Sequence, residues 1–294
     1  MNDTMKILLY KIEEMVSIED TVRDIADLAM QDRICRVSNY DMKMEELVEE
    51  KVNRTPVLLM DFCKHRDTGP GLATKNEKTK GFDLEDDQAF GEMTAILYDP
   101  KTAFVAIQYN HYGPRPGTIA DYISQFQPDA RVSFLPRIRD DIAREIEKKQ
   151  YNSELSVTYS TAIFSESDEA RNLFLDADAL GNFGTHIGEV TIIVKKGRGK
   201  FAKMQNQVPF LQRIFRMNDD GNTSLKSAKV TGAMTEEDKP EVLDILSAKV
   251  FDEREGLEID PKTQMYSFTS RCRLLRDAFA AWKSKGIITA DKLQ

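Results

Sequence analysis

A β-hairpin predicted at residues 93–109 restricts the fold of this chain more than any other local feature. Two apolar and aromatic runs, Met93 to Tyr98 and Ala103 to Tyr109, flank the tetrapeptide Asp99-Pro100-Lys101-Thr102. Proline at the second position of that tetrapeptide favours a tight turn, and runs of this composition favour strands. We therefore expect antiparallel pairing here and an antiparallel sheet around it.

The rest of the chain alternates between strand-like and helix-like segments. Further strands are predicted at residues 5–12, 34–40, 55–62, 130–136, 154–163, 190–194, 224–231 and 265–269. Helices are predicted at residues 17–33, 41–53, 119–126, 139–149, 165–180, about 201–215 and 270–285, with a helix or loop at 235–248 and a long polar loop at 63–88. This order predicts an α+β fold of mixed antiparallel sheets flanked by helices. We expect two lobes, residues 1–164 with the hairpin and residues 165–294.

The composition describes a soluble globular protein. Of the 294 residues, 41% are hydrophobic and 31% are charged. The longest apolar runs fall well short of the roughly 20 residues that a membrane-spanning helix needs. The N-terminus carries Asp3 and has no small-residue cleavage site, so it does not resemble a secretory signal. We expect a cytoplasmic protein.

Residues 190–218 concentrate positive charge in an acidic chain. The segment has seven basic residues and no acidic residue, while the net charge of the chain is -8, so the other residues sum to about -15 (-8 minus 7). The seven cations are Lys195, Lys196, Arg198, Lys200, Lys203, Arg213 and Arg216. A short strand, a turn with Gly197 and Gly199, and an amphipathic helix kinked at Pro209 could present these cations and backbone N–H groups to a polyanion. The alternative is an ordinary solvated turn and the exposed face of a helix.

A region of opposite charge lies near the N-terminus. Residues 13–50 have twelve acidic and four basic residues, a net charge of -8 (4 minus 12). Such a region repels nucleic acid, so we interpret it as a solvated face, with a protein-contact surface on the predicted helix 41–53 as the alternative.

Few residues are arranged for metal binding or catalysis. Cys35, Cys63 and Cys272 are widely spaced and are interpreted as reduced thiols, and the three histidines are equally scattered. The candidate metal cluster lies around residues 83–92, where carboxylates could hold Mg²⁺ for phosphodiester cleavage. Its members are Asp83, Glu85, Asp86, Asp87 and Glu92. We favour a solvated acidic loop, and we expect no catalytic residues, no metal and no cofactor.

The hairpin region carries a family resemblance. Gly91-Glu92, Leu97-Tyr98-Asp99-Pro100, Gln108, Asn110 and Gly113 resemble the core of an uncharacterised bacterial family associated with phage-defence genes. The order of elements over about residues 90–216 is also similar to that of RexA-like proteins, which bind DNA in temperate-phage exclusion, and more remotely to the B component of the Kiwa defence system. In RexA-like proteins a strand leads into a lysine-rich segment, and residues 190–203 occupy that place here.

The resemblance implies a function as well as a fold. It implies a homodimer and a membrane-protein partner from the same system, which would recruit the chain to the inner face of the membrane. Together with the basic segment, it predicts a non-enzymatic, largely sequence-independent DNA-binding protein of phage defence or exclusion, in which the seven cations contact phosphates. Two alternatives remain open. One is a metal-dependent nuclease that uses Asp83, Asp86, Asp87 and Glu92, and the other is a protein-binding sensor or inhibitor without a nucleic-acid role.

Overall fold

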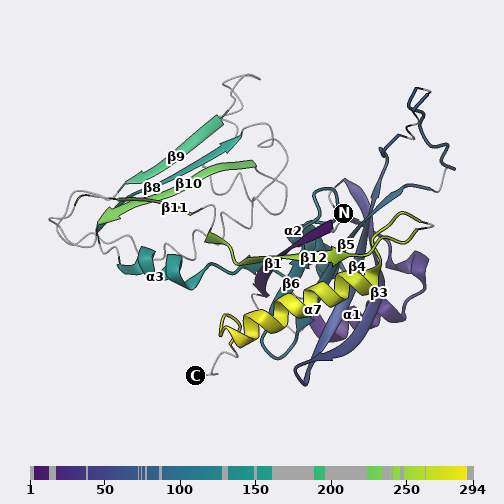
Figure 1. The fold of residues 1–294 in the computed structure, drawn as a ribbon, viewed down its shortest axis with the longest axis horizontal. Helices are drawn as coiled ribbons and strands as arrows, with labels where there is room; N and C mark the ends of the chain where they lie inside the picture. Colours follow the sequence, from purple (N-terminus) through teal and green to yellow (C-terminus); the bar gives the residue numbers. More distant parts are fainter. Residues whose placement is uncertain are drawn as a thin grey trace. The chain divides into compact units, whose positions relative to one another are not determined.

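The computed structural model describes residues 3–12, 18–37, 39–71, 73, 75–76, 78–85, 88–127, 132–148, 151–160, 189–195, 224–233, 239, 241–245, 248–261 and 263–289. The chain divides into two units (Figure 1). The first consists of Met1–Leu8, Ile12–Ser133 and Asp252–Gln294, and the second of Leu9–Lys11 and Phe134–Phe251. The lobe boundary predicted at residues 164–165 lies outside the described residues and stays a prediction.

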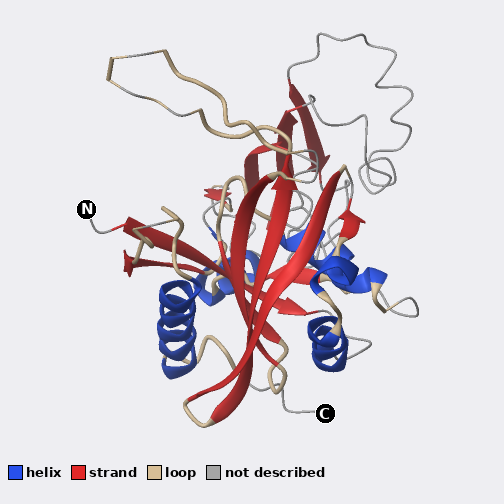
Figure 2. Ribbon diagram, turned by 90° about the vertical axis from the view of Figure 1, so that its right-hand side faces the viewer, coloured by secondary structure: helices blue, strands red, loops and turns tan. Residues whose placement is uncertain are grey.

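The first unit is built on a long twisted sheet, drawn in red in Figure 2. The strand order is β12-β1-β6-β5-β4-β3-β2. The strands are β1 (Asp3–Ile12), β2 (Cys35–Val37), β3 (Tyr40–Val52), β4 (Thr55–Arg66), β5 (Phe90–Asp99), β6 (Phe104–Gln108) and β12 (Phe251–Leu257). Neighbouring strands from β2 to β6 pair antiparallel. The predicted fold class, α+β with antiparallel sheets and flanking helices, is confirmed.

The hairpin that the sequence predicted is β5 and β6. Ile96 lies opposite Ile107 and Asp99 opposite Phe104. The Asp99 carboxylate accepts the Lys101 backbone N–H at 3.0 Å, and its carbonyl accepts that of Ala103 at 2.9 Å. The side chain of Asp99 is fully buried, and the Lys283 ammonium lies 2.6 Å from it. The turn therefore depends on a long-range charge contact as well as on its proline.

Helices cover both faces of this sheet. The helices of the first unit are α1 (Ile18–Asp27), α2 (Pro116–Gln125) and α7 (Phe268–Ser284), with a short 3-10 turn at Met30–Arg33. On α2, the Tyr122 ring packs edge-on against Phe62. On α7, Arg271 pairs with Asp61. Because Asp61 and Phe62 are consecutive in β4, their side chains point to opposite faces, so α2 and α7 lie on opposite sides of the sheet.

The prediction of a helix at residues 41–53 was wrong. These residues form β3, which pairs with β4 in a hairpin whose turn, Asn53-Arg54, has φ of 50° and 68°. Two consecutive positive φ values are typical of the tight turn that matches strand twist. The Glu, Lys and Met residues of the segment favour helix, but pairing with the buried apolar strand β4 outweighs this weak local preference.

The acidic residues of β3 are largely engaged within the protein. The Glu49 carboxylate accepts a hydrogen bond of 2.7 Å from Arg23 of α1, and Arg276 of α7 pairs with Glu50. The Arg23 hydrogen bond holds the pKa of Glu49 below its usual value. These pairs favour a structural role for this part of the acidic region over a free protein-contact surface.

The second unit contains a four-stranded antiparallel sheet in the order β11-β10-β8-β9. Its strands are β8 (Tyr151–Ser160), β9 (Glu189–Lys195), β10 (Ser224–Ala233) and β11 (Glu241–Asp244), and the unit also has β7 (Phe134–Pro136) and α3 (Asp140–Lys148). Leu155, Val157, Ala228 and Val230 from one face of the sheet form a core with Ile138 and Ile146. The strict alternation of β8 produced a correct strand prediction.

Two further local predictions differ from the structure. Residues 241–244, predicted as helix or loop, form β11. The strand predicted at 265–269 is replaced by the start of α7 at Phe268, where the Ser267 hydroxyl caps the helix by accepting the Ser270 N–H. The strand β12 was not predicted, because its charged sequence FDEREGL lacks apolar alternation. The helices predicted at 165–180 and 201–215 lie outside the described residues.

Within the described ranges, no helix combines the length and apolar character needed to cross a lipid bilayer.

All three cysteines are unpaired thiols. Burial raises the pKa of Cys63 and of Cys272 to about 12, and it also raises the pKa of the half-buried Cys35. We expect a thiol-reactive chromogenic reagent at pH 8 to modify at most one thiol in the native protein, Cys35, because only the thiolate reacts. In denaturant all three should react, and a Cys35→Ser variant should show no fast phase. Rapid native modification of two or more thiols would contradict this packing.

Candidate functional site

The structure describes one of the seven predicted DNA-contacting residues. Lys195 ends β9, the edge strand of the four-stranded sheet, and its side chain is 68% exposed. Its ammonium lies 3.4 Å from the Glu154 carboxylate on β8. An exposed pair of this kind contributes little, so Lys195 can exchange partners. The other six, Lys196, Arg198, Lys200, Lys203, Arg213 and Arg216, lie outside the described residues.

The candidate metal cluster receives no support from the part of the chain that the structure describes. No group of three or more potential ligands is found there. Glu92 takes part in an ion pair instead, because its carboxylate lies 2.5 Å from the Arg66 guanidinium. Asp86 and Asp87 lie outside the described residues.

A different group of cationic and aromatic side chains gathers at one end of the first unit's sheet. We call it the cation–aromatic surface, and its members are Tyr40, Lys64, Arg66, Tyr109, Tyr112 and Arg115. Lys64 and Arg66 end β4, and Lys64 lies opposite Met42 of β3. The two-residue period of strands therefore places Tyr40, Lys64 and Arg66 on the same face. The other three members come from the connection between β6 and α2.

Each cation of this surface stacks on a tyrosine. The Lys64 ammonium lies 4.1 Å from the Tyr40 ring centre, the Arg66 guanidinium 4.6 Å from that of Tyr112, and the Arg115 guanidinium 5.6 Å from that of Tyr109. Such contacts contribute about 0.5–1 kcal/mol each at exposed sites. Tyr109 and Tyr112 are 42% and 55% exposed as whole residues, so both are accessible to a ligand.

The cations of this surface also repel one another. The pKa of Lys64 is lowered from its usual value first by desolvation and then by the positive charges of Arg115 and Arg66, with Glu92 acting in the opposite direction. The charged form of Lys64 is therefore less favoured here than for a lysine in water. An anion placed here would relieve the repulsion, so the arrangement is suited to phosphate or carboxylate.

The loop that carries Tyr109, Tyr112 and Arg115 is held by Asn110 and Gly113. Both residues belong to the motif that resembles the phage-defence family, which we call the resemblance motif. The Asn110 amide donates to the Met93 carbonyl at 2.9 Å and its oxygen accepts the Tyr112 N–H at 3.1 Å. A Cβ atom at Gly113 would lie 2.4 Å from the Thr94 hydroxyl oxygen, so only glycine fits. The motif thus has a structural role, which is to fix the loop that supports the aromatic side chains.

A pocket of about 310 Å³ adjoins this surface. It lies beside the N-terminus of α7 and the ends of β5 and β6. Its lining includes Tyr109, His111, Glu92, Gln108, Met265, Tyr266 and Arg271. Tyr109 belongs to both the cation–aromatic surface and the lining of the pocket.

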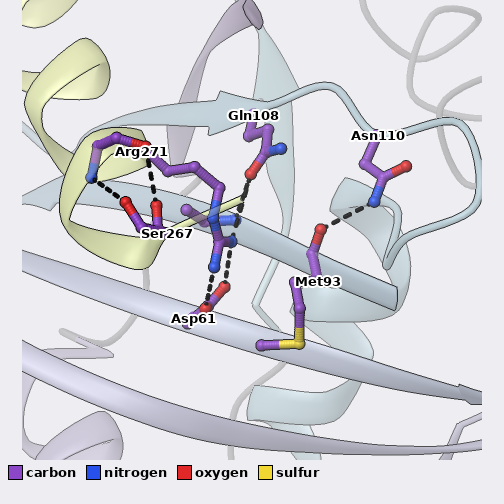
Figure 3. A network of polar contacts seen from close by, with 8 residues as sticks. Asp61, Met93, Gln108, Asn110, Ser267 and Arg271 are labelled. Atoms are coloured by element: carbon purple, nitrogen blue, oxygen red, sulfur yellow. Dashed lines mark hydrogen bonds and ion pairs between the residues drawn. The ribbon is translucent and has the colours of Figure 1, made fainter. Parts of the chain in front are cut away.

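A buried polar network stands at this pocket (Figure 3). Two nitrogens of the Arg271 guanidinium donate to the Asp61 carboxylate at 2.5 and 2.7 Å, and neither side chain is more than 4% exposed. The Gln108 carbonyl oxygen accepts the Ala95 N–H at 3.1 Å and lies 3.5 Å from Arg271. Burial raises the pKa of Asp61 while the hydrogen bonds from Arg271 oppose the rise. The Arg271 Nε atom is buried without a hydrogen-bond partner in the structure as described.

The sequence did not single out this site. Its residues come from β3, β4, the 109–115 loop and α7, which lie far apart along the chain. One signal was available, because the stretch YNHYGPR at 109–115 combines two tyrosines, histidine and arginine directly after a predicted strand. The arginines near the start of α7 pair with acids: Arg271 with Asp61, Arg273 with Glu258, and Arg276 with Glu50.

Comparison with known families identifies one match. Residues 10–270 match a family described as of unknown function, DUF6731, and the chain belongs to this family. A comparison with curated proteins gave no match.

The ion pair at the pocket leads to a stability prediction. Changing Asp61 to Asn leaves the Arg271 charge buried and unpaired, so we expect a loss of about 3–5 kcal/mol in the free energy of unfolding. A double variant, Asp61→Leu with Arg271→Met, removes both charges and should recover most of that loss. Urea unfolding followed by circular dichroism measures both. A single variant as stable as the wild type would show that the pair does not hold α7 to the sheet.

Proposed function

We propose that this member of the DUF6731 family is a non-enzymatic protein that binds nucleic acid largely independently of sequence. The observation that carries the proposal is the cation–aromatic surface, in which Lys64, Arg66 and Arg115 each lie over a tyrosine ring and two of these tyrosines, Tyr109 and Tyr112, are exposed. Proteins that bind nucleic acid strands without sequence preference combine cations along the backbone with aromatic rings on which bases stack. Both parts are present here within one group of side chains.

The basic segment 190–218 supplies a second contact in this proposal. Lys195, its described member, is exposed at a sheet edge. Four of the remaining six cations of the segment lie within eight residues of Lys195, and Arg213 and Arg216 follow later in the segment. Contacts of phosphates with the cations of either region make the affinity fall as the salt concentration rises.

The biological setting rests on the resemblance to RexA-like and Kiwa-type proteins. We propose a role in phage defence or exclusion, as a cytoplasmic homodimer that a membrane-protein partner recruits to the inner membrane face.

The tyrosines and arginines of the cation–aromatic surface would also suit a protein interface, where these residue types dominate binding energy. A protein partner is therefore the second candidate.

The test is a salt titration of binding to a single-stranded oligonucleotide and to a duplex. The surface variant changes Lys64, Arg66 and Arg115 to Gln. We expect it to bind a single strand about 100-fold more weakly at 0.1 M salt, with a salt slope reduced by about 2, since each phosphate contact contributes about 0.7 to the slope. A segment variant with Lys195, Lys196 and Arg198 changed to Glu should weaken binding in the same way.

The matched control removes three cations elsewhere. Lys51, Arg54 and Lys101 are exposed, and Lys51 and Arg54 lie at the opposite end of the β3–β4 hairpin from Lys64, roughly 30 Å away at about 3.3 Å per residue. Changing these three to Gln should leave the salt slope of the affinity nearly unchanged.

Equal losses of affinity in the control and surface variants would show that net charge alone explains the effect, and they would reject the surface. Oligonucleotides that bind no form of the protein would reject the function and favour a protein partner, and strand cleavage with Mg²⁺ would favour a nuclease.

A further inference from the structure

Glu92 places a negative charge beside the cations of the cation–aromatic surface. It belongs to the resemblance motif and lies on β5 directly opposite Lys64 of β4. Directly opposite residues of an antiparallel pair have their side chains on the same face, and Arg66 follows Lys64 by two residues on the same strand. Glu92 therefore shares a face of the sheet with both cations.

The Glu92 carboxylate is paired with Arg66. Nη1 of Arg66 donates to Oε1 of Glu92 at 2.5 Å. The side chains of Arg66 and Glu92 are 22% and 23% exposed, so salt screens this pair less than a pair in open solvent. The same guanidinium lies 4.6 Å from the ring centre of Tyr112, which is 55% exposed. A phosphate that binds Arg66 therefore competes with a carboxylate that is already in contact with it.

The charge of Glu92 also acts on Lys64. The pKa of Lys64 is lowered first by burial and then by the charges of Arg115 and Arg66, and Glu92 opposes this lowering. Glu92 is thus an internal counter-ion for cations that repel one another. Carboxylate and phosphate oxygens both accept charge-assisted hydrogen bonds from a guanidinium, so a phosphate can take the place of the Glu92 carboxylate at Arg66.

We propose that Glu92 determines the ligand specificity of the cation–aromatic surface by holding Arg66 until a phosphate of a nucleic acid strand replaces it. The inference rests on the proposed nucleic-acid function and deepens it, because it selects a strand over small free anions. A strand that already contacts Lys64 or Arg115 brings further phosphates to Arg66 at a high effective concentration. A free anion must displace the carboxylate at its bulk concentration. Glu92 is a positioning residue in this role, since it acts through Arg66.

The test compares Glu92→Gln, which removes the charge and keeps the size, with a matched control. The control is Glu255→Gln, which removes an exposed carboxylate of β12 in the same sheet. The sheet order places β12 four strand spacings from β4, roughly 19 Å at about 4.8 Å each. This distance exceeds the screening length of about 8 Å at physiological salt. Urea unfolding followed by circular dichroism measures the stability of each variant.

The decisive measurement is a salt titration of binding to a single-stranded thymidine oligonucleotide. We expect Glu92→Gln to bind about 5-fold more tightly than the wild type at 0.1 M salt, since the ligand no longer has to break an ion pair. The salt slope should stay nearly unchanged, because the number of phosphate contacts is the same. Glu255→Gln should bind as the wild type does. In an Arg66→Gln background, adding Glu92→Gln should change the affinity less than about 2-fold, because the cation that Glu92 holds is absent.

Three results overturn the inference and leave the proposed function standing. The first is a Glu92→Gln variant that binds the oligonucleotide as the wild type does, so that loss of the pair affects stability alone. The second is an equal gain in affinity in Glu255→Gln, which makes the effect one of net charge. The third is an undiminished gain in the Arg66→Gln background, which shows that Glu92 does not act through Arg66.

Inorganic pyrophosphate tests the ion pair without a nucleic acid. Its binding is followed by NMR of the arginine side-chain N–H groups, with Arg66 assigned from the signal that Arg66→Gln lacks. We expect Glu92→Gln to bind pyrophosphate about 5-fold more tightly than the wild type, with a shift of the Arg66 signal. This result supports the role of Glu92 even if no oligonucleotide binds and the proposed function fails. Equal binding by the two proteins, of pyrophosphate and of the oligonucleotide, overturns it.

Discussion

The buried ion pair between Arg271 and Asp61 joins the last helix of the first unit to the centre of its sheet across 210 residues of sequence. Burying either charge alone would cost several kcal/mol, so each side chain requires the other. Asp61 lies in the middle of β4, and Arg271 lies in the first turn of α7 just after the Ser267 cap. The position of α7 on the sheet, and the pocket beside its N-terminus, both depend on this pair.

The same helix carries further ion pairs that connect it to the sheet. Lys283 reaches Asp99 in the β5–β6 turn, and Arg276 reaches Glu50 in β3. Three cations of one helix thus contact carboxylates on β3, on β4 and at the end of β5. These charges are committed to the fold. On the cation–aromatic surface, Arg115 and Arg66 lie close enough to Lys64 to lower its pKa, and Arg66 also pairs with Glu92.

The residues of the resemblance motif have structural roles around the loop after β6. Asn110 and Gly113 fix the loop after β6 through contacts with Met93 and Thr94, and Gln108 takes part in the Arg271 network. None of these residues was chosen from the sequence as a ligand contact. Asn110 and Gly113 hold the loop, and Tyr109, Tyr112 and Arg115 of the same loop belong to the cation–aromatic surface.

The sequence by itself determined the elements whose signals are local. The β5–β6 hairpin, the alternating strand β8, the strand at 190–194 and the amphipathic helix α7 were all predicted, because turn chemistry and hydrophobic period act within a few residues. Tertiary structure alone decided that the Glu-rich segment 40–52 is a strand, because pairing with the apolar strand β4 outweighs its helix propensity. It also decided the candidate site. Strand register brings Tyr40 and Lys64 together, and the contact of Arg66 with Tyr112 and the ion pair of Arg271 with Asp61 join residues far apart in the chain. Contacts between such distant residues cannot be recognised in a local sequence pattern.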